Sequence, residues 1–372
     1  MTNSSQVRNN AGQTIRLHID QAAIVENYKI LKDASVSKKC GAAVKANGYG
    51  CGVKTVARAL ASAGCRQFFV ADAFEGIKLR TIQSDADIFI LNGVFEETIS
   101  LLVENNLIPV LNSLSQIKLW YQTATDQACA VHIDTGMNRL GLRPNEAYNC
   151  LDDLKSVPKL IMSHFANADD PEDQKNLSQL EAFSALAQKY AGIEASMANS
   201  AATLSNPQSH FQLTRPGIAI YGGNPFTHRA NPMKSVVKAE ARIIDIREVL
   251  PDETVSYGGT FVAKETKRIA VCGVGYADGY PRTVSGQGVP LREHLPNGAQ
   301  AFINGQPIDC VGRVTMDLTM FDVTQLPLNS IKIGDWVELF GDQISLDDFA
   351  EQSGTVSYEI LTGIGRRYGL SI

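Results

Sequence analysis

The sequence has no run of about twenty apolar residues of the kind that spans a bilayer, and its first thirteen residues lack the apolar core of a secretory signal. We therefore expect a cytoplasmic protein that does not enter membranes. The net charge is also small, −5 over 372 residues at neutral pH, which gives no general electrostatic basis for binding nucleic acid. A small molecule is the expected partner.

Paired cysteines are absent as well. The seven cysteines are scattered along the chain without a Cys-x-x-Cys pair, so we expect reduced thiols and neither a disulfide framework nor a structural zinc site. Phosphate-binding loops of the G-x-G-x-x-G and Walker types are also missing. A dinucleotide or a nucleoside triphosphate is therefore not the first choice of ligand.

Short apolar runs alternate with longer amphipathic segments in the first part of the chain. This alternation is typical of strand–helix units built around a parallel sheet. The predicted strands cover residues 41–44, 67–71, 88–91, 108–111, 128–133, 159–164, 193–197 and 215–221. Eight such units predict an α/β fold, a (β/α)8 barrel.

The alternation of apolar and amphipathic segments ends after Tyr221, where the sequence contains Gly222, Gly223 and Pro225. From Ser235 onward, β-rich runs separated by glycine and proline predict a C-terminal mainly β domain. We place the barrel at residues 14–233 and the β domain at residues 234–372, with a strand near residues 14–19 as a candidate to pack on the latter.

Lys45 closes the first predicted strand and is followed by a turn rich in glycine. Lysine is mostly exposed, so one interpretation is a solvated lysine at the end of a strand. The other is a desolvated amine that holds a cofactor aldehyde as a Schiff base, with Tyr49 placed to bind a phosphate. The rest of the chain has to decide between the two.

Other polar residues also follow predicted strands, and barrels of this kind gather their catalytic groups at the C-terminal ends of the strands. A solvated surface explains any one of these residues more readily than all of them together. Gly217 and Ser200 suit a phosphate cradle, because they offer unobstructed amides and a hydroxyl. The residues at strand ends are Lys45, Arg139, His164, Asn199, Ser200 and Arg215.

A metal ion is another candidate ligand at the same strand ends. His132, Asp134 and His164 could ligate zinc or iron, but no further histidine lies nearby in the pattern. We therefore expect no metal, with His164 as an orienting group and His132 as a histidine of the core.

With these residues assembled, the chain resembles the alanine racemase family of fold-type III pyridoxal-phosphate enzymes. The resemblance extends from Leu17 to Tyr368, and its motifs match in content and order. They are D-T-G-M-N-R-L-G at 134–141, V-S-Y-G-G-T at 255–260, V-G-Y-A-D-G-Y-P-R at 274–282, V-G-R-V-T-M-D at 311–317 and Y-E-I-L at 358–361.

The resemblance implies a pyridoxal-phosphate-dependent racemase that interconverts L- and D-alanine with one base on each face of the substrate, and that supplies D-alanine for peptidoglycan. Lys45 would carry the cofactor and act on one face. Tyr257 would act on the other, and would come from the partner subunit of a homodimer. A free phenol ionises only near about pH 10, so its phenolate would need nearby positive charge, and His164 and Arg215 would belong to the network that supports it.

The resemblance also implies roles in binding. Arg215 would face the pyridine nitrogen, Arg139 would contact the phenolic oxygen and the substrate carboxylate, and Met316 of the partner subunit would offer its amide. The implied phosphate ligands are Tyr49, Ser200, Gly217, Ile218 and Tyr358, with Asn199 beside them. The implied access corridor is formed by Tyr276, Arg313 and Asp317.

The chain departs from the family at Gly48, Cys51 and Asn138, which leave the proposed chemical groups intact, and at His132. His132 stands where many members have a carbamylated lysine that orients the arginine equivalent to Arg139, so an ion, a water or a neutral imidazole would have to substitute. Two alternative functions remain: a racemase of broader amino-acid specificity on the same scaffold, and a carrier that binds pyridoxal phosphate without turnover.

Overall fold

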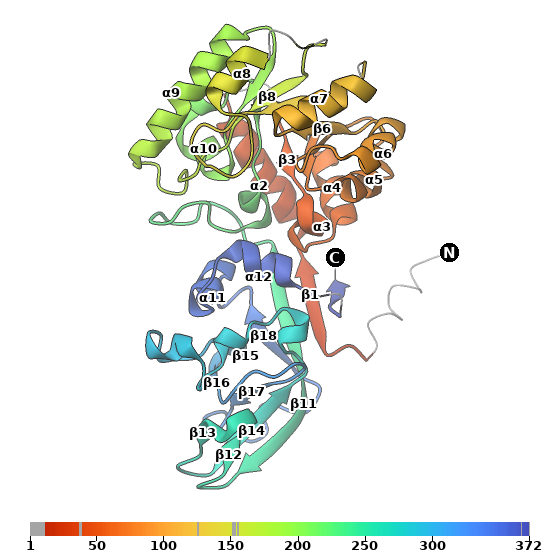
Figure 1. Cartoon of the computed structure of the whole chain (residues 1–372). Helices are drawn as coiled ribbons and strands as arrows, with labels where there is room; N and C mark the ends of the chain where they lie inside the picture. Colours follow the sequence, from red (N-terminus) through yellow and green to blue (C-terminus); the bar gives the residue numbers. More distant parts are fainter. Residues whose placement is uncertain are drawn as a thin grey trace, which may run out of the picture. The chain divides into compact units, whose positions relative to one another are not determined.

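The computed structural model describes residues 12–36, 39–124, 126–150, 154, 156–365 and 367–371. It divides into two compact units, one formed by Gln21–Lys234 and the other by the described residues on either side of that segment. The predicted combination of a (β/α)8 barrel and a mainly β second part is confirmed, and each unit is described below by itself (Figure 1). No helix among the described residues is long and apolar enough to cross a lipid bilayer.

The first unit is a barrel of parallel strands. A seven-stranded sheet runs in chain order from β3 to β9, and β10 pairs with β2, which directly precedes β3. Backbone hydrogen bonds from Gln212 to Ala195 and from Gly41 to Thr214 close the ring. The strands are β2 (Lys39–Cys40), β3 (Ala42–Ala43), β4 (Gln67–Val70), β5 (Asp87–Ile90), β6 (Ile108–Leu111), β7 (Ala130–His132), β8 (Leu160–Met162), β9 (Glu194–Ser196) and β10 (Leu213–Thr214).

The eighth predicted strand, residues 215–221, is wrong in its extent. The strand is β10, which ends at Thr214, and Ile218–Tyr221 form the 3-10 helix η4. Pro216 lacks an N–H and Gly217 adopts φ −128° and ψ −91°, outside the extended region. The chain therefore leaves the barrel wall directly after Arg215, and its buried apolar residues belong to a helical turn.

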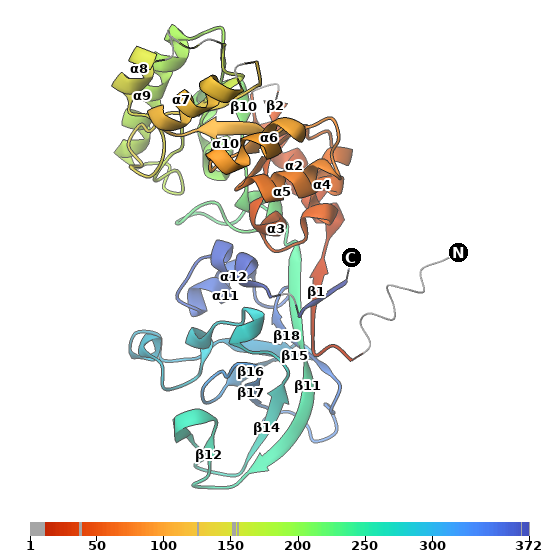
Figure 2. The same ribbon diagram turned by 45° about the vertical axis from the view of Figure 1, so that its right-hand side comes forward.

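Helices cover the outside of the barrel strands (Figure 1, Figure 2). Several begin at a capping side chain a few residues after a strand: Asp72 accepts from the Glu75 N–H, and Ser113 accepts from the Gln116 N–H. The helices of this unit are α2 (Gln21–Ala34), α3 (Lys45–Tyr49), α4 (Val53–Ser62), α5 (Ala73–Arg80), α6 (Ile99–Glu104), α7 (Leu114–Thr123), α8 (Pro144–Cys150), α9 (Gln174–Lys189) and α10 (Ser200–Ser205).

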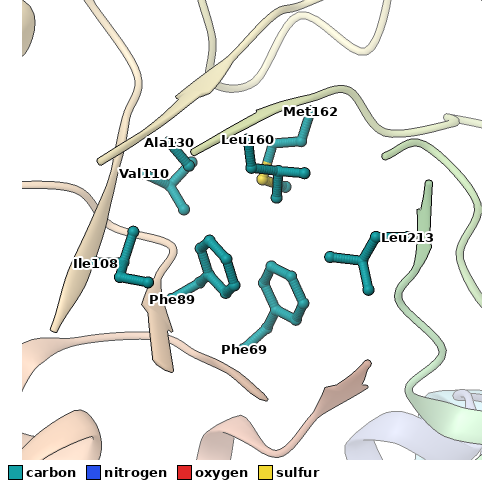
Figure 3. Packing of buried hydrophobic residues seen from close by; sticks show 8 residues of the cluster. All are labelled: Phe69, Phe89, Ile108, Val110, Ala130, Leu160, Met162 and Leu213. Carbon is teal, nitrogen blue, oxygen red and sulfur yellow. The ribbon is translucent and has the colours of Figure 1, made fainter. Parts of the chain in front are cut away.

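An apolar layer fills the barrel. Its side chains come from successive strands and converge on a stacked pair of rings, Phe69 and Phe89, whose centroids are 4.7 Å apart (Figure 3). The other members are Ile108, Val110, Ala130, Leu160, Met162 and Leu213, with Ala43 and Leu91 packed against them. Because side chains on a strand alternate between faces, the residue two positions after each of these also turns toward the interior.

The second unit is built on one sheet of mainly antiparallel strands, in the order β14-β17-β16-β15-β18-β11-β1-β19. Strand β1 belongs here because it pairs with β11. The strands are β1 (Ile15–Ile19), β11 (Val237–Val249), β14 (Lys267–Cys272), β15 (Gln300–Ile303), β16 (Gln306–Cys310), β17 (Thr319–Asp322), β18 (Trp336–Phe340) and β19 (Gly369–Ser371), with the hairpin of β12 (Thr254–Val255) and β13 (Phe261–Val262) and the helices α11 (Leu346–Gln352) and α12 (Ser357–Gly363).

The stacked ring pair gives a prediction for barrel stability. Phe89→Ala removes a side chain that is 2% exposed, and we expect it to lower the free energy of unfolding by about 3–5 kcal/mol. The matched control is Phe74→Ala, whose side chain is 71% exposed and should change stability by no more than about 0.5 kcal/mol. Urea unfolding followed by circular dichroism measures both, and equal effects would contradict the assignment of this core.

Candidate active site

A layer of polar side chains lies above the apolar core, at the C-terminal ends of the strands. Each member stands two residues after an interior residue of that core. The pairs are Ala43 and Lys45, Val110 and Asn112, Ala130 and His132, Met162 and His164, and Leu213 and Arg215. The barrel therefore gathers side chains that are far apart in the sequence into one layer.

Arg215 is the centre of this layer. The residue is 6% exposed, and its guanidinium donates from Nη1 to the Ser196 hydroxyl at 2.5 Å and from Nη2 to the Ser163 carbonyl at 2.6 Å. It lies 5.8 Å from the centroid of the Phe69 ring, against the apolar layer. Burial lowers the pKa of Arg215 to about 9, so the group stays a cation at neutral pH.

His164 is held in one neutral form by Arg215. The Arg215 Nη2 lies 3.3 Å from His164 Nδ1, and a guanidinium can only donate. Nδ1 therefore accepts, and the ring proton is on Nε2. Burial, followed by the charge of Arg215, lowers the pKa of His164 well below its ordinary value, which agrees with this neutral tautomer.

Lys45 follows β3 at the start of a strained turn. Ala46, Asn47 and Tyr49 all have positive φ, between 51° and 56°, a conformation that costs energy for residues with a side chain. Burial, and then the charge of Arg139, lowers the pKa of the half-buried Lys45 amine. A larger share of neutral amine makes this lysine a better nucleophile for a carbonyl compound.

Arg139 is carried by a tight loop that begins and ends at the same strand. The Asp134 carboxylate accepts the N–H groups of Gly136, Met137 and Asn138 through one oxygen, at 2.8–3.1 Å. Farther along, the Leu142 N–H donates to the His132 carbonyl at 2.9 Å. The exposed Arg139 side chain is thus anchored through its loop at the end of β7.

An anion cradle lies beside this layer. The Tyr49 ring stacks on Tyr221 with centroids 4.5 Å apart, and its hydroxyl lies 2.5 Å from where a Cβ on Gly217 would stand. The Gly217 N–H points to the Ser200 hydroxyl at 2.9 Å. Ser200 and Ile218 are the first residues of α10 and η4, so backbone donors of two helical turns meet here.

Asn199 takes a different part in the cradle. Its side chain caps α10 by accepting the Ala202 N–H at 3.0 Å, which fixes the position of Ser200.

The remaining predicted site residues lie in the second unit. Tyr257 is 73% exposed in the turn between β12 and β13. The adjoining Gly258 lies against the Arg313 guanidinium: a Cβ added to Gly258 would stand 2.6 Å from Arg313 Nη1. The Ser256 hydroxyl donates a hydrogen bond to the Arg313 carbonyl at 2.6 Å. These contacts bring the tyrosine segment and Arg313 together.

A second group of these residues surrounds Tyr276. The Tyr276 N–H donates to Thr315 and the Ala277 N–H donates to Met316, both at 3.0 Å. Asp317, next along the chain, pairs with Arg367 at 2.7 Å. Tyr358 lies on α12.

The sequence patterns missed Asn112, Ser163 and Ser196. Asn112 bonds the His132 ring, and the two serines supply the acceptors for Arg215. The sequence does contain a pattern that points to these three residues, because each of them follows or ends an apolar strand, as Lys45 and His164 do.

The donor set suits an anionic cofactor with an aldehyde. A lysine amine of lowered pKa stands in a layer that also holds a buried arginine, and a glycine whose Cβ would strike Tyr49 lines the anion cradle. Pyridoxal phosphate has the matching groups, an aldehyde, a phosphate and a ring nitrogen. Among the residues that the structure describes, no cluster of three or more histidine, cysteine or acidic side chains is arranged to hold a metal ion.

Comparison with known proteins gives one consistent result. Residues 19–225 match the family model "Alanine racemase, N-terminal domain", and residues 236–371 match "Alanine racemase, C-terminal domain". The biosynthetic alanine racemase of Agrobacterium fabrum is 45% identical, over 95% of this chain and 92% of its own. The alanine racemase of Rhizobium meliloti is 44% identical, over 95% of both chains.

Solved structures agree with these relatives. Alanine racemase from Bartonella henselae, with covalently bound pyridoxal phosphate, is similar at a TM-score of 0.87 and 34% identity, covering 96% of this chain and 99% of that one. The biosynthetic alanine racemase from Pseudomonas aeruginosa has the same TM-score and coverage at 32% identity.

The neutral histidines predict how stability depends on pH. Burial, then Arg215, lowers the pKa of His132 from 6.5 to about 4, so below pH 6.5 the unfolded chain binds a proton that the folded chain does not. The contribution of His132 to the free energy of unfolding is therefore fully present above about pH 6.5. It falls by about 1.4 kcal/mol per pH unit as the pH is lowered toward the folded pKa of about 4. Denaturant unfolding at pH 7.5 and pH 5 should show a smaller loss for His132→Gln than for the wild type. Equal losses would contradict a neutral His132.

Proposed function

This chain belongs to the alanine racemase family of pyridoxal-phosphate-dependent isomerases, and we propose that Lys45 and Tyr257 are the two groups with which it moves the Cα proton between L- and D-alanine. The observation that carries this proposal is the lysine with a lowered pKa in the same barrel layer as the buried Arg215. If Lys45 were only a solvated surface lysine, neither the buried cation in the same layer nor the strained turn after Lys45 would have an explanation.

The bound cofactor makes the Cα hydrogen of an attached amino acid acidic by withdrawing electrons. Lys45 would hold the cofactor covalently and, once freed by the substrate, take or return the proton on one face. Tyr49, Ser200, Gly217, Ile218 and Tyr358 would bind the phosphate. Arg215 would lie at the ring nitrogen, and because a guanidinium does not readily give up a proton, that nitrogen would stay unprotonated.

Tyr257 would serve the opposite face. Its exposure in a hairpin turn supports the proposal that it reaches the site of a partner subunit in a homodimer, together with the backbone amide of Met316. His164 supports the same role, because its Nδ1 is taken by Arg215 and its Nε2–H remains a donor. That donor would stabilise a phenolate.

Arg139 and the Met316 amide would bind the substrate carboxylate, while Tyr276, Arg313 and Asp317 would line a narrow access corridor suited to a small side chain. The same proposal includes a cytoplasmic enzyme that supplies D-alanine for peptidoglycan.

The direct test incubates the purified protein with L-alanine in deuterium oxide. The proposal predicts D-alanine that carries deuterium at Cα. A protein that binds the cofactor but exchanges no Cα hydrogen would contradict it, and faster turnover of serine, lysine or arginine would indicate a racemase of broader specificity.

Tyr257→Phe separates the two bases. Removal of the phenolic oxygen should lower racemisation by about 10²–10⁴-fold, while Lys45 still exchanges deuterium into one enantiomer. The matched control is Tyr148→Phe, on α8, which should leave both rates unchanged. Loss of exchange in both enantiomers, with the cofactor still bound, would argue against two independent bases.

Gly217→Ala tests the cradle. Its new methyl group would stand 2.5 Å from the Tyr49 hydroxyl, so we expect the affinity for pyridoxal phosphate to fall by about tenfold or more, equivalent to about 1.4 kcal/mol. In the control Gly192→Ala, no atom lies within 4 Å of the added Cβ, and the affinity should not change. Absorbance titration of the cofactor-free protein measures both, and an unchanged affinity for Gly217→Ala would remove Gly217 from the cradle.

A further inference from the structure

Three segments of the second unit meet around Tyr276 and Met316. They are the Tyr276 turn at residues 275–280, the Met316 loop at residues 315–317, and a C-terminal link at residues 363–367 that joins α12 to β19. All three lie within the same compact unit of the chain. The side chains of Tyr276 and Met316 are both exposed, so contacts of the surrounding backbone have to hold the two residues in place.

The Tyr276 turn and the Met316 loop touch through their backbones. The Tyr276 N–H donates to the Thr315 carbonyl at 3.0 Å, and the Ala277 N–H donates to the Met316 carbonyl at the same distance. A Cβ on Gly275 would stand 2.3 Å from both of these carbonyl oxygens, so no side chain fits between the two segments. The position of Tyr276 therefore depends on that of Met316.

The C-terminal link packs against the same turn. The Gly365 N–H donates to the Asp278 carbonyl at 3.0 Å. A Cβ on Gly279, whose φ is +89°, would stand 1.9 Å from the Gly363 carbonyl oxygen. Here too backbone meets backbone, and the link is fixed against the turn.

Arg367 of the link bridges two carboxylates, one on the turn and one on the loop. Its Nε forms an ion pair with Asp278 Oδ1 at 2.6 Å, and its Nη1 donates to Asp317 Oδ1 at 2.7 Å. Asp278 ends the 3-10 helix that begins at Tyr276, and Asp317 directly follows Met316. One guanidinium, whose donors form a rigid fork, therefore joins the two segments.

The burial of Asp278 distinguishes this bridge from a surface ion pair. The residue is 2% exposed, and its Oδ2 accepts the Gly275 N–H at 3.0 Å. Burial raises the pKa of Asp278, whereas the Gly275 N–H and Arg367 lower it. Loss of the guanidinium would leave two carboxylates without their common cation, one of them buried, and this costs far more than breaking an exposed pair.

We propose that Arg367 is a positioning residue, which bridges Asp278 and Asp317 and thereby fixes Tyr276 and Met316 relative to each other. The catalytic consequence rests on the proposed function, in which the Met316 amide binds the substrate carboxylate and Tyr276 lines the access corridor. The bridge itself does not depend on that function. Lysine could not replace Arg367, because an ammonium group is a single point charge without the fork.

Hydrogen–deuterium exchange of the holoenzyme tests the bridge. In Arg367→Ala, the peptide with the Tyr276 and Ala277 amides should exchange about tenfold faster or more, because loss of a charge-assisted bond lets the turn open more often. The matched control is Arg247→Gln, an exposed arginine of β11 in an ion pair with Asp245 at 3.4 Å, which should leave that peptide unchanged. Unchanged exchange in Arg367→Ala would overturn the proposal.

Asp317→Ala supplies the same test if Arg367→Ala does not fold. It removes the exposed acceptor of the bridge and leaves Asp278 its cation. The Tyr276 peptide should again exchange faster than in the wild type. Exchange at the wild-type rate would overturn the bridge.

Kinetics test the consequence for the substrate. Arg367→Ala should raise KM for alanine by about tenfold or more, because displacing a substrate-positioning group by about 1 Å costs up to about 10²-fold. The cofactor absorbance should not change. Arg367→Lys should recover only a minor part of the loss, since it keeps the charge and lacks the fork. Full recovery with lysine, or an unchanged KM in Arg367→Ala, would overturn the positioning role.

Thermal unfolding of each variant accompanies these measurements, because a purely structural role would lower stability without a selective rise in KM. A wild-type protein that forms no D-alanine would contradict the proposed function instead. Hydrogen exchange would still decide whether Arg367 holds the turn and the loop together.

Discussion

The buried guanidinium of Arg215 is the constraint on which the barrel site depends. A cation at this depth is tolerated only when its donors are satisfied, and Ser196, the Ser163 carbonyl and His164 supply the acceptors. These partners end or follow neighbouring strands, so the arginine ties one side of the barrel mouth together. Burial lowers the pKa of both His132 and His164, and the charge of Arg215 lowers both further.

Because of burial and the charge of Arg215, the histidines of the site act as hydrogen-bonding groups and do not gain or lose a proton at neutral pH. His164 and His132 both have lowered pKa values and are neutral, and Nε2 of His164 is a hydrogen-bond donor. Lys45 is the group whose amine is shifted toward its neutral, reactive form. An enzyme that moves one proton between two faces of a substrate benefits when the other nearby groups cannot exchange it.

Much of this arrangement could be predicted from the sequence, because it follows from a local rule. Apolar strands with a polar residue just beyond the end identified Lys45, His164 and Arg215, and the motifs of the second unit identified the family. The eighth strand was wrong because residues 218–221 are as apolar as a strand, and only the Pro216–Gly217 break shows that they form a turn. Asn112 follows an apolar strand in the same way as Lys45, so its position could have been noted from the sequence, but its contact with His132 joins two neighbouring strands and could not be predicted from it.

The central claim is that Lys45 holds pyridoxal phosphate in this barrel, and borohydride reduction of the purified holoenzyme tests it most directly. The account predicts that the imine absorbance disappears and that peptide mass mapping finds the reduced cofactor on Lys45 and on no other lysine. Cofactor on a different lysine, or no reducible imine in a protein saturated with pyridoxal phosphate, would contradict it.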